Sequence, residues 1–209
     1  MDIVINHQYF QIDIKVKKVK RTTLRVIGKD SLRITTPTKL SRLMVETMVI
    51  SHYDWIIKQM NERVFLLPNQ LLLQGFVYHI QLDDHLVDPY HIQGEVIYYR
   101  LGGIETLLSE VQCEIAKKFN EAAIPYGDVS LRFRKMKTRW GVCHIGKRHI
   151  VLNTKLIMLP DELMMYVIYH ELTHLLVPNH QKEFYVALEK KVSNPYVLRK
   201  KIKEYVIFL

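Results

Sequence analysis

Long apolar runs are missing from this sequence of 209 residues. No stretch of 18 or more consecutive apolar residues occurs, so we expect no membrane-spanning helix. The first residues, Met-Asp-Ile-Val-Ile-Asn-His, lack the basic region and the apolar core of a signal peptide. Only two cysteines occur, Cys113 and Cys143, and they form neither a disulfide framework nor a ligand-spaced pair. We therefore expect a cytoplasmic protein that has no membrane partner.

Low-complexity segments and internal repeats are also missing, and the composition is that of an ordinary globular protein. The net charge of +9 is unevenly spread. Residues 129–160 contain eight Lys or Arg and no Asp or Glu, and smaller basic clusters occupy 15–25 and 199–203. Such charge either keeps exposed faces solvated or attracts a polyanion or an acidic substrate. For the basic block 129–160 we leave both interpretations open, whereas for the two smaller clusters we favour solvated faces.

Residues 163–177 form the most informative stretch. It contains one formal charge, Glu171, in a run that is otherwise apolar or neutral and has no Pro or Gly. Asp161 and Glu162 suit the positive end of a helix, and Pro178 ends the run. A helix that is apolar on all sides is buried, so its carboxylate needs a polar or cationic partner.

The partners of this carboxylate have the spacing of metal ligands. His170 and His174 are four residues apart and lie on one helical face, within the pattern His-Glu-Leu-Thr-His. His180 follows a Pro-Asn turn, which can bring it back over the same face as a third ligand. The reserve candidates for third ligand are Glu183 and Glu189. The alternative is a set of core histidines that are hydrogen-bonded to Glu171, but this leaves three polar groups in an apolar run unexplained.

The remaining patterns predict an α+β fold. The expected strands lie within residues 3–36, 71–82, 95–101, 129–134 and 149–153. The expected helices are 41–62, 104–123 and 163–177. We expect one domain over 1–209, in which a strand-rich lobe with one helix, 1–100, precedes a lobe that carries the metal ligands, 101–209.

Several short segments together resemble one known family. They are Thr23–Val26 with Leu32–Ile34, Tyr53–Ile56, Arg139–Cys143, Leu152–Asn153, Leu159–Pro160, His170–His174, Pro178–His180 and Phe184. Arg-Trp-Gly ahead of the His-Glu helix is the most specific part. On these segments the chain resembles the YgjP-like metallopeptidases, which are zincins related to the SprT and WLM groups.

The resemblance implies both an architecture and a site. It implies an N-terminal hairpin and strand region packed on a zincin-like, or minigluzincin, core with a buried metal-binding helix and an antiparallel sheet. It also implies that His170, His174 and His180 hold one Zn²⁺ per chain and that Glu171 is catalytic, the same four residues to which the spacing points.

We therefore expect a zinc metallohydrolase, a metallopeptidase in which Glu171 activates a metal-bound water to cleave peptide bonds. Its partner is a peptide or protein substrate, which can add as a strand beside the strand that precedes the metal helix. Candidates for contacts to the substrate or the transition state are Arg139, Tyr185 and Tyr196, and the sequence does not choose among them.

Two other functions stay open at this point. A nucleotide hydrolase that cleaves phosphoanhydrides could use the basic block 129–160, although the chain has no Gly-rich phosphate loop. A non-catalytic nucleic-acid-binding protein with a structural zinc would also explain the basic block. Glu171 argues against this second alternative, because a closed structural site needs no base.

Overall fold

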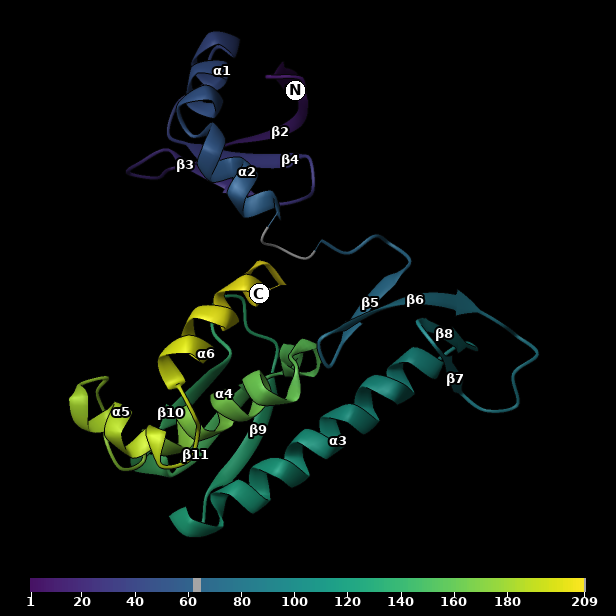
Figure 1. Ribbon diagram of the computed structural model, residues 1–209, viewed down its shortest axis with the longest axis vertical. Coiled ribbons are helices and arrows are strands. Elements are labelled where there is room, and N and C mark those ends of the chain that lie inside the picture. Colours follow the sequence, from purple (N-terminus) through teal and green to yellow (C-terminus); the bar gives the residue numbers. More distant parts are fainter. Residues whose placement is uncertain (62–64, 209) are drawn as a thin grey trace. The chain divides into compact units, whose positions relative to one another are not determined.

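The computed structural model describes residues 1–61 and 65–208 (Figure 1). By their internal contacts they divide into an N-terminal unit, Met1–Phe65, and a C-terminal unit, Leu66–Leu209. The expected boundary between lobes, after residue 100, falls within the C-terminal unit. The expected organisation as one domain stays a prediction. Among the described helices, none has both the length and the apolar character needed to cross a membrane.

The N-terminal unit is a four-stranded sheet covered by two helices. Its strands are β1 (Asp2–Ile5), β2 (Gln8–Val16), β3 (Thr23–Val26) and β4 (Ser31–Thr36), in the order β1-β2-β4-β3. The predicted hairpin is confirmed, because β3 pairs antiparallel with β4 and Val26 lies opposite Leu32. Alternating side chains of β2 and β4, such as Phe10, Ile12, Leu32 and Ile34, form a core of their own.

The helix predicted over 41–62 is two helices, α1 (Arg42–Ser51) and α2 (Tyr53–Asn61). In a continuous helix the N–H of His52 would bond to the carbonyl of Met48. Instead the Ser51 hydroxyl donates to that carbonyl at 3.0 Å, and His52 Nδ1 lies 2.9 Å from it. The His52 N–H turns to Val49, so side chains that compete for a backbone acceptor break the helix. Residue 62 lies outside the described residues.

The C-terminal unit begins with a second four-stranded sheet. Its strands are β5 (Gln70–Leu73), β6 (Phe76–Leu82), β7 (Tyr90–Gln93) and β8 (Val96–Tyr99), in the order β5-β6-β8-β7. The single strand predicted over 71–82 is therefore wrong. Gln74 and Gly75 both have positive φ, which is the geometry of a tight hairpin turn, and they fold the run back on itself.

A third sheet lies next to the metal-ligand segment. It contains β9 (Ser130–Arg134), β10 (Gly141–His144) and β11 (His149–Asn153), in the order β10-β11-β9. The expected antiparallel sheet is wrong in one pair, because β9 runs parallel to β11. After β9 the chain forms β10 at the opposite edge of the sheet, and β11 then lies between β9 and β10. β10 is therefore an edge strand.

Helix α4 (Asp161–Thr173) is the central element of this unit. It packs against α3 (Gly103–Ala123), against β10 and β11, and against α5 (Lys182–Glu189) and α6 (Pro195–Lys201), as Figure 1 shows. Short 3₁₀ turns connect or extend these elements. They are η1 (Ile124–Tyr126), η2 (Ile145–Lys147), η3 (Thr154–Met158) and η4 (Ile202–Phe208). Because α4 has neighbours on all sides, its apolar character all round is explained.

Candidate metal centre

The last turn of α4 and the turn after it carry the predicted ligands. The helix ends at Thr173, four residues earlier than predicted, and His174 is its C-cap. The N–H groups of Leu175 and Leu176 bond three residues back, which tightens the chain into a 3₁₀ turn ahead of Pro178. His180 then lies two residues before the start of α5, whose N-cap is Gln181. The early end therefore starts the turn that returns His180 to the end of α4.

The three predicted histidines come together at this place. One ring nitrogen from each of His170, His174 and His180 lies within 4.8 Å of the others, and Nε2 of His180 lies 2.9 Å from Nε2 of His170. Their ring centroids are 4.7–5.0 Å apart. The reserve ligands Glu183 and Glu189 are exposed on α5 and do not belong to this group.

Phe184 forms the floor below the three imidazoles. It lies in the first turn of α5 and is fully buried, with its ring centroid 4.7–4.9 Å from each imidazole centroid. The helix that follows His180 thus packs an aromatic ring against all three candidate ligands. This contact restricts the orientation of each imidazole.

The environment keeps the imidazoles neutral. Burial, followed by the proximity of His174 and His180, lowers the pKa of His170 to about 3. Burial is also the largest cause that lowers the pKa of His174 and the pKa of His180. Neutral imidazole is the form that binds metals, so the histidines are in the required protonation state at neutral pH.

Glu171 is buried beside the histidines and faces β10. Its side chain is 7% exposed, and burial raises its pKa to about 7, against the opposing effects of Arg139 and the backbone N–H of Cys143. A Cβ atom built on Gly141 would lie 2.6–2.8 Å from the Glu171 side chain. The carboxyl therefore occupies space that only a glycine at position 141 leaves free.

These residues fit a zinc ion. Three nitrogens at mutual distances of a few ångströms can share one tetrahedral centre, and three neutral imidazoles are a known ligand set for catalytic zinc. His174 Nδ1 lies 3.3 Å from the carbonyl of Val177, so a proton on Nδ1 leaves Nε2 free for the metal. Nδ1 of His170 is buried and has no hydrogen-bond partner in the described part of the chain.

A family comparison assigns this half of the chain. Residues 103–205 match the family model described as YgjP-like, metallopeptidase domain. This segment is a YgjP-like metallopeptidase domain. The match spans α3 to η4 and includes every candidate ligand. No curated protein matches the chain.

Two solved structures resemble part of the chain. One is the metallopeptidase zymogen jannalysin of Methanocaldococcus jannaschii, with 21% identity, a TM-score of 0.36, and coverage of 47% of this chain and 96% of that one. The other is the metallopeptidase zymogen abylysin of Pyrococcus abyssi, with 23% identity, a TM-score of 0.36, and coverage of 51% and 94%.

The three predicted contact residues lie at different places around the YgjP-like site. Arg139 is exposed in the loop before β10, and its charge acts on Glu171. Tyr185 is buried, and its hydroxyl accepts a hydrogen bond from Arg199 at 2.5 Å. Tyr196 is 57% exposed and stacks on Tyr185, with ring centroids 4.5 Å apart. Arg139 is therefore the one of the three that acts on the predicted catalytic carboxyl.

Sequence reasoning missed three residues of the YgjP-like site. Gly141 and Phe184 belong to the segments that resemble the family, but the spacing of the sequence motifs assigns no function to either residue. The basic pattern of residues 199–203 predicts a solvated cluster, and no sequence signal separates Arg199 from its basic neighbours. Its position depends on how α6 packs against α5, which the local pattern does not encode.

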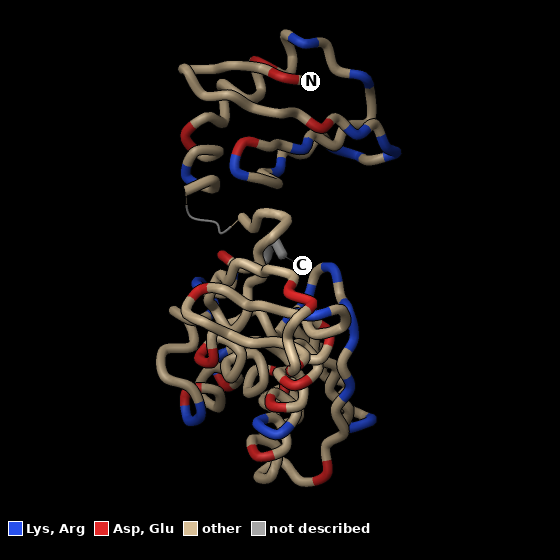
Figure 2. The backbone as a smooth tube through the Cα atoms, turned by 90° about the vertical axis from the view of Figure 1, so that its right-hand side faces the viewer, with Lys and Arg blue, Asp and Glu red and all other residues tan. Residues whose placement is uncertain are grey.

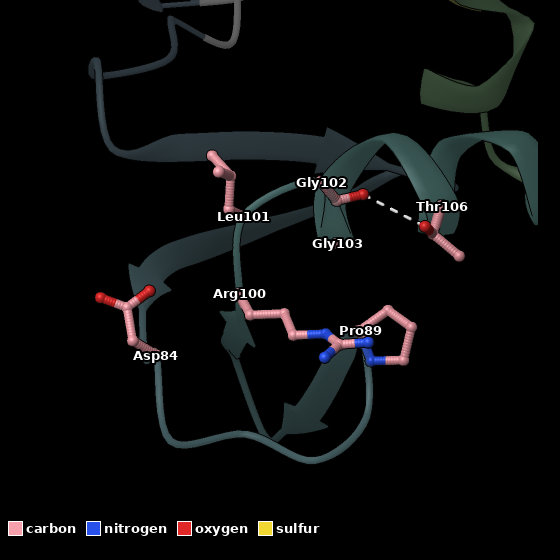
Figure 3. Close-up of a pocket in the computed structure, with 7 residues that line it drawn as sticks. All are labelled: Asp84, Pro89, Arg100, Leu101, Gly102, Gly103 and Thr106. Carbon is pink, nitrogen blue, oxygen red and sulfur yellow. Dashed lines mark hydrogen bonds between the residues drawn. The ribbon is translucent and has the colours of Figure 1, made fainter.

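A small cavity adjoins the histidines and Glu171. It has a volume of about 160 Å³ and is lined by Trp140, Gly141, Tyr166, Val167, His170, Glu171 and Ile202. A more open cavity at the start of α3 includes Arg100, Gly102 and Thr106 (Figure 3). It contains none of the predicted site residues. In that cavity the Thr106 hydroxyl donates a hydrogen bond to the Gly102 carbonyl. The smaller cavity belongs to the candidate centre, because His170 and Glu171 line it.

Proposed function

We propose that the chain is a zinc-dependent peptidase that uses His170, His174 and His180 as ligands and Glu171 as general base. The observation that carries the proposal is the convergence of three imidazole nitrogens within 4.8 Å beside a buried carboxyl. The YgjP-like metallopeptidase match over residues 103–205 supports the same reaction class.

The chemistry divides between the ion and the protein. Zinc bound there would polarise a substrate carbonyl and make a water more acidic. Glu171 accepts a proton from the attacking water and returns it to the leaving amine. The backbone N–H of Cys143 donates to the Glu171 carboxylate and orients it, and Gly141 leaves it room. Arg139 places a positive charge near this carboxyl from the loop before β10.

The surroundings of the site suit an extended peptide. β10 is an edge strand, so the backbone groups along its free side can pair with a peptide that lies beside it. The cavity of about 160 Å³ begins at Glu171 and has apolar walls from Trp140, Val167 and Ile202. We propose that it accepts an apolar side chain next to the cleaved bond.

Cleavage of a phosphoanhydride is the second candidate. No residue of the basic block 129–160 forms an ion pair in the described part of the chain. Burial, followed by the nearby charge of Lys135, lowers the pKa of Lys155. Figure 2 shows basic segments following one another along one side of the C-terminal unit. A nucleotide or nucleic acid could neutralise such a surface. The apolar cavity and the edge strand favour a peptide as the substrate.

Metal content and hydrolysis test the proposal together. We expect about one zinc per chain in the wild type. His180→Ala should lose most of it, because one of three ligands is removed. His91→Ala, which changes an exposed histidine of β7, should keep the metal. A wild type that binds no zinc under any loading contradicts the proposal, and full retention by His180→Ala contradicts the ligand assignment.

Glu171→Gln should keep zinc and the fold but lose about 10²- to 10⁴-fold in peptide hydrolysis, since the amide cannot accept the proton. The measurement is turnover on a panel of peptides and nucleoside triphosphates at equal metal content. Turnover of peptides at the wild-type rate contradicts the assignment of the base. Pyrophosphate release that depends on Glu171, without peptide cleavage, would establish the second candidate.

A further inference from the structure

Arg199 is fixed beside the candidate metal centre. Its Nη1 donates to the Tyr185 hydroxyl at 2.5 Å, and its guanidinium carbon lies 5.9 Å from the Tyr185 ring centroid. Tyr185 is only 7% exposed, and its ring contacts the Phe184 ring edge-on at a centroid distance of 5.5 Å and stacks on the Tyr196 ring at 4.5 Å. A buried aromatic ring therefore holds a guanidinium that itself stays exposed.

Two consecutive residues of α5, Phe184 and Tyr185, lie between this guanidinium and the histidines. Tyr185 follows Phe184, whose ring contacts all three imidazoles. The guanidinium is carried by α6, which packs against both α4 and α5, whereas Arg139 comes from the loop before β10.

Arg199 has no acidic partner among the described residues. The carboxylates of α4's first turn are paired elsewhere, Asp161 with Lys118 and Glu162 with Lys201. A guanidinium has five N–H donors, and its one hydrogen bond in the described structure is the one to Tyr185. Its other donors make no hydrogen bond to a described residue, and the contacts with Tyr185 restrict the side chain, which lowers the entropy lost when these donors bind a ligand.

We propose that Arg199 determines specificity by binding a carboxylate of the substrate, either an acidic side chain or the C-terminal carboxylate of a peptide. The planar guanidinium matches the two oxygens of a carboxylate. The inference rests on the proposed peptidase function, because that function supplies the peptide and the metal that place the carboxylate near α6.

The carboxylate preference can be tested by binding alone, without catalysis, using pairs of hydroxamic acids. The hydroxamate group binds zinc, and the two compounds differ only in whether the far end is a carboxylate or a primary amide. Compounds with spacers of several lengths, and with the carboxylate on a side chain or at the C-terminus, distinguish the two sources. Dissociation constants would be measured by calorimetry on the full-length, zinc-loaded protein.

The wild type should bind the best carboxylate at least about tenfold more tightly than its amide. Arg199→Gln should abolish this preference while the affinity for the amide and the zinc content stay unchanged. Tyr185→Phe, which removes the acceptor that holds the guanidinium, should reduce the preference. Lys200→Gln, an exposed cation on the same helix, should leave it intact.

Each other outcome has a defined meaning. If the wild type binds the carboxylate and the amide equally at every spacer length, the role of Arg199 is overturned. Because both compounds still bind the zinc, this result leaves the metal site and the proposed function intact. Failure of both compounds to bind protein that carries zinc contradicts the proposed function itself. A third result is that ATP displaces the amide compound from the wild type but not from Arg199→Gln, while neither protein prefers the carboxylate compound. That result overturns carboxylate binding by Arg199 and assigns its guanidinium to phosphate binding.

Discussion

Gly141 shows, at the scale of the single residue, how the candidate base is accommodated. A Cβ atom at this position would come within 2.6–2.8 Å of Cγ, Cδ and Oε1 of Glu171. Gly141→Ala should therefore displace the carboxyl and lower peptide hydrolysis by about 10²-fold, in line with the sensitivity of catalysis to a shift of about 1 Å. The three histidines are not displaced by this change, so zinc content should stay at the wild-type value.

Gly146→Ala is the matched control for this substitution. Gly146 lies in η2, its φ is not positive, and a Cβ atom there meets nothing within 4 Å. Both variants would be compared by initial rates and by zinc per chain. Wild-type hydrolysis by Gly141→Ala would show that the Glu171 side chain does not need its observed position.

The candidate ligands could be predicted from sequence because they lie close together in it. His170 and His174 are one helical turn apart, and His180 follows a turn that Pro178 makes necessary. Arg199 could not be predicted in this way, because it reaches the site through the packing of α6 on α5. Glu183 and Glu189 were reasonable reserve ligands by spacing, and only the direction of α5 removes them from the group.

At the scale of secondary structure, Asn153 connects the loop that carries Arg139 and Trp140 to the end of β11. Its side-chain amide donates to the carbonyls of Met136 and Arg139 at 2.9 Å and 2.8 Å, and its Oδ1 accepts from the Lys155 N–H at 3.2 Å. The residue is fully buried. Asn153→Ala should lower the free energy of unfolding by about 2–3 kcal/mol, because buried backbone groups lose their partners.

Denaturant unfolding of the full chain measures this effect. Asn120→Ala is a suitable control, since Asn120 is exposed on α3 and should change stability by less than about 0.5 kcal/mol. Equal stabilities of the two variants would mean that the loop finds other hydrogen-bond partners once Asn153 is removed.

Helices and strands were predictable where one periodic pattern covers the whole element. The stripe in 104–123 corresponds to α3, and the apolar run before the histidines corresponds to α4. The failures arise where a local interaction outweighs the pattern. The Ser51 hydroxyl and the His52 ring contact the acceptor that would continue α1, and Gly75 allows a turn inside what seemed one strand. The parallel pairing of β9 with β11 depends on strand order, which periodicity does not encode.

At the scale of the whole molecule, each unit has its own hydrophobic core. The core of the N-terminal unit is built around Phe10 and Leu32, whereas that of the C-terminal unit is built around Phe119, Leu152 and Phe184. Every sheet takes all its strands from one unit. The C-terminal unit also contains the YgjP-like domain and all the candidate ligands.

We therefore expect a fragment of residues 66–209 to fold cooperatively and to bind about one zinc, because its buried apolar contacts and its ligands are complete without the N-terminal unit. Thermal unfolding followed by circular dichroism, together with elemental analysis, checks both properties. His180→Ala in the same fragment separates site binding from adventitious zinc. A fragment that stays unfolded with or without zinc would mean that residues 1–65 contribute directly to the stability of the metal-binding unit.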